Sequence, residues 1–76
     1  MTRQLIEYVA NALVDHPDEL RLTETEEDGM IVYLLHVAPR DIGKVIGRRG
    51  RVARALRTLL KVSSIQTRTR AILEID

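Results

Sequence analysis

The 76-residue chain has no cysteine, no tryptophan and no phenylalanine, and tyrosine occurs only at Tyr8 and Tyr33. Because cysteine is missing, the chain can form neither a disulfide nor a thiolate zinc site, which fits a reducing compartment. Because aromatic residues are scarce, the stacking of bases on aromatic platforms, as RRM and OB domains use it, is disfavoured.

Long apolar segments are missing as well. The longest apolar run, Met30 to Leu35, is far too short to span a bilayer. Glu7 interrupts the apolar pattern near the N-terminus, which is not typical of a secretory signal. We therefore expect a cytoplasmic protein without a membrane partner.

The sequence also lacks the groups that catalysis requires. No nucleophile is paired with a base, and no cluster of His, Cys or carboxylate residues has the spacing of metal ligands. His36 lies in an apolar stretch without a second ligand nearby, so we interpret it as a structural histidine. We expect no enzymatic activity, no metal, no cofactor and no small-molecule substrate.

The net charge of +1 conceals a strong asymmetry along the chain. Residues 1–39 contain two basic and eight acidic residues, whereas residues 40–61 contain eight basic residues and only Asp41 as an acid. Residues 62–76 are neutral in sum. Such a segment predicts an anionic partner on one face of the fold, although a solvated basic helix would have the same composition.

The hydrophobic pattern predicts six secondary-structure elements. Apolar residues at three- and four-residue spacing predict an amphipathic helix, and alternation predicts a strand. The expected elements are a helix over 3–15, strands over 20–25 and 30–38, a short helix over 42–46, a helix over 51–62 and a strand over 70–75. Residues 63–67 are expected to form a loop.

The order α-β-β-α-α-β determines the expected architecture. The crossover between Val37 and Arg70 contains two helices, so it can return the last strand parallel to the central one, with a right-handed connection. We expect a single domain, residues 1–76, with an α+β fold of two layers. Three helices would cover one face of a three-stranded mixed sheet.

Local signals refine the joints between these elements. Asp28 and Gly29 are typical of a two-residue hairpin turn. Asp41 is expected to cap the short helix, and Gly47 is expected to end it in the left-handed conformation. The apolar arc of the helix over 51–62 consists of Val52, Ala53, Leu56, Leu59 and Leu60.

Glycines at positions 43, 47 and 50 interrupt this helical region, although a glycine inside a helix costs about 1 kcal/mol relative to alanine. The spacing G-x-x-x-G-x-x-G matches neither the G-x-x-x-x-G-K-[ST] of a P-loop nor the G-x-G-x-x-G of a dinucleotide site. A helix-turn-helix that binds duplex DNA fits the turn itself. It does not require two strands before the helix pair and one strand after it.

The stretch DIGKVIGRRGRVARAL resembles the I-G-x-x-G signature of the KH domain, and the element order is that of its type II form. The longer stretch LHVAPRDIGKVIGRRGRVARALRTLL is similar to the small stand-alone bacterial KH proteins, the KhpA-like RNA-binding proteins. The resemblance covers essentially the whole chain. It implies a cytoplasmic, chaperone-like protein that binds single-stranded RNA, often acts with a second KH-domain protein and is linked to cell shape and cell-wall growth.

In the KH family the glycine loop clamps the backbone of about four single-stranded nucleotides. The resemblance assigns this role to Gly47, Arg48, Arg49 and Gly50. The glycines would let the main chain approach phosphates, and the arginines would add permanently charged donors. Amides at the start of the following helix would point at the same phosphates.

The resemblance also places further residues around the RNA. Lys44 and Arg51 flank the loop, whereas Arg54 lies further along the helix, where solvation alone would explain it equally well. Candidates for the groove floor, of which at least one must face the core, are Ile42, Gly43, Val45 and Ile46. Candidates for the opposite wall are Arg70 and Ile72 of the last strand and the acidic loop over 24–29.

Two apolar patches indicate a protein partner. In the central strand Val32 and Leu34 would point away from the helices, and Leu59 and Leu60 near the end of the long helix form a rival patch. Beside single-stranded RNA we therefore expect self-association or a second KH-domain protein as partner. The alternative function is a KH-fold protein-interaction module with little RNA binding of its own.

Overall fold

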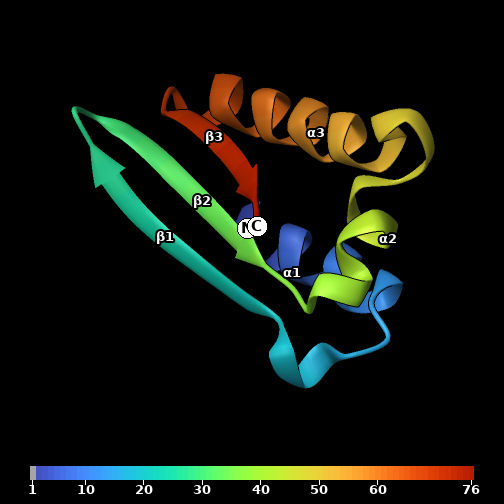
Figure 1. The fold of residues 1–76 in the computed structure, drawn as a ribbon. Coiled ribbons are helices and arrows are strands. Elements are labelled where there is room, and N and C mark those ends of the chain that lie inside the picture. Colours follow the sequence, from blue (N-terminus) through green and yellow to red (C-terminus); the bar gives the residue numbers. More distant parts are fainter. Residues whose placement is uncertain (1) are drawn as a thin grey trace.

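The computed structural model describes residues 2–76, and of Thr2 and Thr67 only the backbone. Within this part of the chain the elements are α1 (Thr2–Leu13), β1 (Arg21–Glu27), β2 (Met30–His36), α2 (Ile42–Ile46), α3 (Arg51–Thr67) and β3 (Arg70–Ile75), joined in part by short 3-10 turns. The predicted order α-β-β-α-α-β is confirmed. Figure 1 shows the helices on one side of the sheet, which confirms the two-layer α+β architecture.

The sheet has the order β1-β2-β3, with β1 antiparallel and β3 parallel to the central strand β2. Asp28 and Gly29 both have positive φ angles, 51° and 77°, and join β1 to β2 as the predicted two-residue hairpin turn. Tyr33 and Leu35 of β2 are buried under the helices, whereas Val32 and Leu34 lie on the outer face and are half-buried. The predicted alternation of the central strand is therefore confirmed.

One hydrophobic core joins the sheet to all three α-helices. It includes Ile6 and Ala10 of α1, Leu35 of β2, Val45 of α2 and Leu56 of α3. Val45 is fully buried, with an exposed fraction of 0%. Among the residues described here, no helix is long and apolar enough to cross a membrane.

Helix α3 is longer than predicted. It extends to Thr67, so the prediction of a loop over 63–67 is wrong. Serine lowers helix propensity by competing for backbone groups, but the Ser64 hydroxyl donates to the Leu60 carbonyl inside the helix (2.9 Å). The helix ends where Arg68 adopts a left-handed conformation (φ 58°) that sequence patterns assign to glycine or asparagine.

The buried face of α3 is narrower than predicted. Ala53, Leu56 and Leu60 are buried and Val52 is partly buried, but Leu59 exposes 45% of its surface. Leu59 lies at the margin of the predicted apolar arc, about 60° around the helix from the buried Leu56. Its side chain belongs to the exposed surface of the helix.

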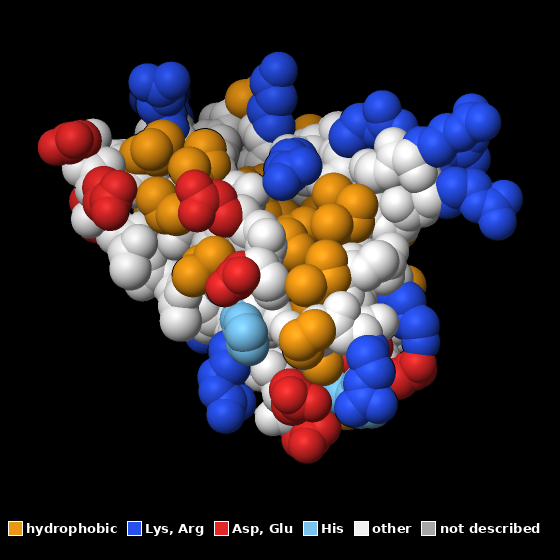
Figure 2. All heavy atoms as spheres, viewed as in Figure 1, with side chains coloured by type: hydrophobic (Ala, Val, Ile, Leu, Met, Phe, Trp, Pro, Cys, Tyr) orange, Lys and Arg blue, Asp and Glu red, His pale blue; other side chains and the backbone are white. Residues whose placement is uncertain are grey.

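The charge asymmetry of the sequence is also an asymmetry in space. Figure 2 shows Lys and Arg side chains along α3 and around the turn before it, whereas Asp and Glu side chains gather over the β1–β2 hairpin; at the lower end of the molecule both kinds occur. Asp41, the only acid in the basic segment, is 1% exposed. Because its carboxylate is turned inward, residues 40–61 present cations to the solvent without an exposed acid of their own.

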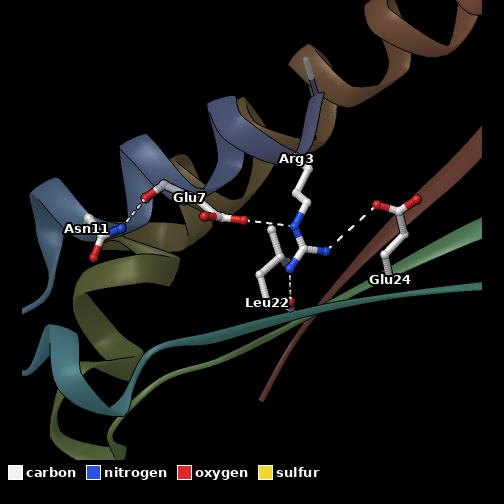
Figure 3. A network of polar contacts seen from close by, with 5 residues as sticks. All are labelled: Arg3, Glu7, Asn11, Leu22 and Glu24. Atoms are coloured by element: carbon white, nitrogen blue, oxygen red, sulfur yellow. Dashed lines mark hydrogen bonds and ion pairs between the residues drawn. The ribbon is translucent and has the colours of Figure 1, made fainter.

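Arg3 connects α1 to the edge strand β1 (Figure 3). Its guanidinium forms ion pairs with Glu7 (Nε–Oε1, 2.9 Å) and Glu24 (Nη1–Oε1, 3.8 Å) and donates to the Leu22 carbonyl (2.6 Å). Burial raises the pKa of the nearby Tyr33 phenol; the negative charge of Glu24 raises it further, and Arg3 opposes the shift. Sequence patterns did not predict the contact of Arg3 with β1, since Leu22 and Glu24 lie 19 and 21 positions away from it.

Asp41 does not cap α2 as predicted. The residue itself has helical angles (φ −98°, ψ −8°) within the 3-10 turn Pro39–Asp41, whereas a capping side chain requires an extended backbone. Its carboxylate instead accepts the N–H groups of Asp15 (Oδ1, 3.2 Å) and His16 (Oδ2, 3.0 Å). Asp41 therefore holds the segment after α1 against the start of α2.

Replacing Asp41 tests the strength of this connection. Asp41→Ala leaves two partly buried N–H groups without their acceptor, which costs on the order of 1–3 kcal/mol. We expect Asp41→Ala to lower the free energy of unfolding by about 2 kcal/mol, measured by urea denaturation followed by circular dichroism. The matched control is Asp18→Ala, at an exposed position, which should change stability by less than about 0.5 kcal/mol. Equal stability of the two variants would contradict the role given to Asp41.

Candidate nucleic-acid interface

The turn between α2 and α3 has a backbone that needs glycine. Gly47 (φ 79°, ψ 168°) leads into the 3-10 turn Arg48–Gly50, and Gly50 (φ 72°, ψ 18°) leads into α3. The predicted positive φ of Gly47 is confirmed, but its ψ is extended instead of left-handed. This combination of angles is essentially limited to glycine.

The three glycines differ in what surrounds them. A Cβ on Gly47 would lie 2.5 Å from Val52 Cγ2 and 2.9 Å from the Val52 backbone nitrogen, so the contact between the turn and α3 excludes any side chain there. A Cβ on Gly50 or on Gly43 would meet nothing within 4 Å. Gly43 also has no positive φ, so neither backbone nor packing requires a glycine at this position.

Hydrogen bonds inside the turn use several of its N–H groups. The N–H of Gly47 donates to the Gly43 carbonyl (2.8 Å), that of Gly50 to the Gly47 carbonyl (3.1 Å), and that of Arg51 to the Arg48 carbonyl. The amides of Gly50 and Arg51 are therefore occupied within the turn. In this conformation these two N–H groups are not available to a phosphate.

Arg48 and Arg49 are exposed at the tip of the turn. Arg49 has a left-handed backbone (φ 56°, ψ 27°), which costs a non-glycine residue about 1–2 kcal/mol. Arg54 Nη2 donates to the Arg49 carbonyl (3.0 Å) and so stabilises this conformation. Arg54 is thus more than a solvated side chain: it holds the turn, a role for which the sequence contained no signal.

The other predicted cations near the turn have different surroundings. Lys44 Nζ is paired with the Asp15 carboxylate, so part of its charge is already compensated. Arg51 is exposed beside the turn. Arg57 Nε donates to the Leu73 carbonyl (3.4 Å) and joins α3 to β3.

The predicted floor residues divide between the core and the surface. Val45 is the one that faces the core, and Ile42 is partly buried against it. Gly43 is exposed, and Ile46 is 36% exposed. Figure 2 shows an apolar strip between α2, α3 and β3, bordered by Lys and Arg side chains along α3 and at the turn.

The residues predicted for the opposite wall of the groove lie toward the C-terminal end of α3. Arg70 and Ile72 are at the start of β3, next to the C-terminal end of α3, whereas the turn precedes the N-terminal end of this helix. The 17 residues of α3 separate the two places by about 25 Å. The acidic hairpin loop likewise lies at the far end of the molecule from the turn (Figure 1). Arg70 and Ile72 instead line a cavity of about 570 Å³ together with Lys61 and Ile65.

His36 lies in β2 as expected but is half exposed on the outer face of the sheet, with Nδ1 3.6 Å from Asp76 Oδ2. Among the described residues, no group of three or more His, Cys, Asp or Glu side chains could hold a metal ion. The arrangement around the turn offers guanidinium groups, an apolar strip and a backbone without Cβ atoms. These are the features that contact a phosphate chain and its bases.

Comparison with known proteins agrees with this geometry. The family described as "KhpA/KhpB, KH domain" matches residues 3–75. A protein of Treponema pallidum named "RNA-binding protein KhpA" is 51% identical over 75 residues, covering 99% of this chain and 94% of the relative. Proteins of the same name from Clostridium acetobutylicum and Aquifex aeolicus are each 44% identical over 73 residues, covering 96% of this chain and 97% and 92% of the relatives. The chain therefore belongs to the KhpA/KhpB family of KH domains.

Proposed function

We propose that this protein is a non-enzymatic, single-stranded RNA-binding protein that grips the RNA backbone with the loop Gly47-Arg48-Arg49-Gly50. The observation that carries the proposal is the α2–α3 turn, in which two exposed arginines lie between two glycines with positive φ angles. The names of the relatives, which describe RNA binding and not a reaction, support it.

The chemistry of the turn suits a phosphate chain. Arginine presents fork-shaped donors that remain charged at any physiological pH, and Arg48 and Arg49 have solvent on the side away from the helices. The hydrogen bond from Arg54 to the Arg49 carbonyl fixes the turn before RNA arrives. A fixed turn loses less conformational entropy on binding.

The bases would lie on the apolar strip between α2, α3 and β3, with Gly43 and Ile46 at its α2 side. Because neither tyrosine belongs to α2, α3 or β3, hydrogen bonds and van der Waals contacts replace stacking on protein rings. We expect micromolar affinity and loose sequence preference. The cellular role we propose is that of a cytoplasmic RNA chaperone or post-transcriptional regulator connected with cell shape and cell-wall growth.

A protein contact is the second part of the proposal, with a further copy or a second KH-domain protein as partner. Leu59 and Val62 are 45% and 50% exposed, which is unusual for large apolar side chains on one helix. At 100° per residue Leu59 lies about 140–160° around α3 from Arg54, Arg57 and Lys61, whereas Val62 lies about 80–140° from them. RNA and a protein partner could therefore bind at the same time. Leu60, the other half of the predicted patch, is buried.

The loop arginines are tested by charge reversal. Arg48→Asp combined with Arg49→Asp should abolish binding of short unpaired RNA without unfolding the domain, since aspartate tolerates the left-handed backbone of position 49. For the unmodified protein, about three neutralised phosphates give a slope of roughly −2 for log K against log salt concentration. Fluorescence anisotropy at several salt concentrations measures both quantities.

The charge-matched control for this pair is Arg21→Asp with Arg40→Asp, at exposed positions outside the turn. It should retain most of the affinity. Intact RNA binding by the folded loop variant would contradict the proposal. Shifts of the loop amides with a protein partner but with no RNA would favour the alternative of a protein-interaction module.

Two glycine substitutions distinguish an effect on stability from an effect on RNA binding. Gly43→Ala should leave stability unchanged or raise it by up to about 1 kcal/mol, because its Cβ meets nothing, yet it should weaken RNA binding by placing a methyl group in the groove. Gly47→Ala should destabilise the domain by more than about 2 kcal/mol, because its Cβ would overlap Val52. Urea denaturation and anisotropy together distinguish the two cases. A Gly43→Ala variant with unchanged affinity would exclude RNA contact at this position.

The protein contact is tested on both candidate patches. Leu59→Lys with Val62→Lys should lower self-association at least tenfold, or abolish the contact with a second KH-domain protein, because it places charge in an apolar interface. Val32→Lys, on the outer face of the sheet, is the comparison. Analytical ultracentrifugation reports the effect. If only Val32→Lys lowers self-association, the contact lies on the outer face of the sheet and not on α3.

A further inference from the structure

An ion pair links α2 to the segment that follows α1, close to the glycine loop. Lys44 is the only charged side chain of α2 and lies three positions before Gly47. Its ammonium nitrogen pairs with Oδ2 of Asp15. The two side chains are 47% and 64% exposed, so a ligand can reach both groups. A phosphate that approaches Lys44 therefore also approaches the Asp15 carboxylate.

The fold holds Asp15 in this position through its backbone. The N–H of Asp15 donates to Oδ1 of Asp41 (3.2 Å), and the N–H of His16 donates to Oδ2 of the same buried carboxylate (3.0 Å). Figure 1 shows the segment after α1 beside α2. Because the backbone is anchored, the Asp15 carboxylate stays close to Lys44, and its effective concentration there does not depend on dilution.

The two sides of the glycine loop therefore differ in available charge. Arg48, Arg49 and Arg51 are exposed, and none of the ion pairs between described residues involves them. On the α2 side, the charge of Lys44 is compensated by Asp15. A phosphate chain is attracted to the tip of the loop and to the start of α3, whereas on the α2 side it meets an occupied ammonium group.

We propose that Asp15 limits RNA binding: its carboxylate holds Lys44 in place of an RNA phosphate and so restricts phosphate contacts to the loop and α3. The inference rests on the proposed function and deepens it, because it names a residue that sets the affinity and the extent of the site. A strand that reached Lys44 would have to break the ion pair, and the released carboxylate would repel the phosphate. Asp15 is thus an internal competitor of the RNA.

Neutralising Asp15 tests this competition. Asp15→Asn keeps the backbone N–H that donates to Asp41 and removes only the side-chain charge. We expect short unpaired RNA to bind about fivefold more tightly at about 50 mM salt, the upper range of what an exposed ion pair contributes. The slope of log K against log salt concentration should become steeper by about 0.7, because Lys44 gains one phosphate contact. The gain should therefore vanish near about 0.5 M salt, as measured by fluorescence anisotropy.

Two comparisons separate the ion pair from general electrostatics. In a Lys44→Gln background, Asp15→Asn should change the affinity by less than about twofold, because the competed ammonium group is gone. Asp18→Asn removes the same charge from an exposed position of the same segment that takes part in none of the ion pairs between described residues. It should also have less than about a twofold effect. Urea denaturation checks that all variants are folded.

The outcomes distinguish this inference from the proposed function. If the unmodified protein binds RNA but Asp15→Asn binds no more tightly, or changes stability without changing the salt slope, the role given to Asp15 is wrong and the loop remains the RNA site. An equal gain with Asp18→Asn, or in the Lys44→Gln background, would likewise overturn it, since the general field would then explain the effect. If neither the unmodified protein nor Asp15→Asn binds RNA, the proposed function itself has failed.

Discussion

The buried carboxylate of Asp41 is the contact on which the placement of the site depends. Helix α2 has only five residues, too few to be stable without support from the rest of the fold. Asp41 accepts two N–H groups from the segment after α1 and thereby sets where α2 begins. Val45 packs into the core, and the chain leaves the core directly after it in the glycine loop. Asp41 and Val45 therefore determine where the exposed arginines of the loop lie.

The same residue also shapes the electrostatics of the molecule. An acid in the basic segment would weaken its field if it faced the solvent, but Asp41 is enclosed and hydrogen-bonded. The surface acids belong mostly to α1, the segment after it and the hairpin, and those of the hairpin lie far from the cations at the turn. The glycine turn and the cations along α3 therefore contribute to one positive field. Under the proposed function, this field would orient RNA along α3.

The sequence predicted the order of elements, the parallel pairing of the last strand and the glycine loop, because each depends on local periodicity or on a family signature. It placed the end of α3 too early, since Arg68 adopts a conformation for which glycine is the usual marker. It gave Asp41 a local partner, whereas the partners are 25 and 26 residues away. The roles of Arg54 and Arg3 could not be predicted either, because the sequence does not show to which backbone carbonyl a long side chain donates a hydrogen bond. The distance of Arg70 and Ile72 from the turn could not be predicted either, because the sequence does not show next to which part of α3 the strand β3 begins.

The parallel pairing of β2 and β3 has a consequence for folding. Val32 lies opposite Ile72, 40 positions later, whereas the turn between α2 and α3 is closed by contacts within a few residues. Local contacts form early in folding and distant pairings form late. We therefore expect the glycine loop to acquire its shape while β3 is still undocked. The apolar strip and the cavity both need β3, so they are completed only in the final step. Destabilising the edge of the sheet would therefore yield a chain with a formed loop but without the apolar strip beside it.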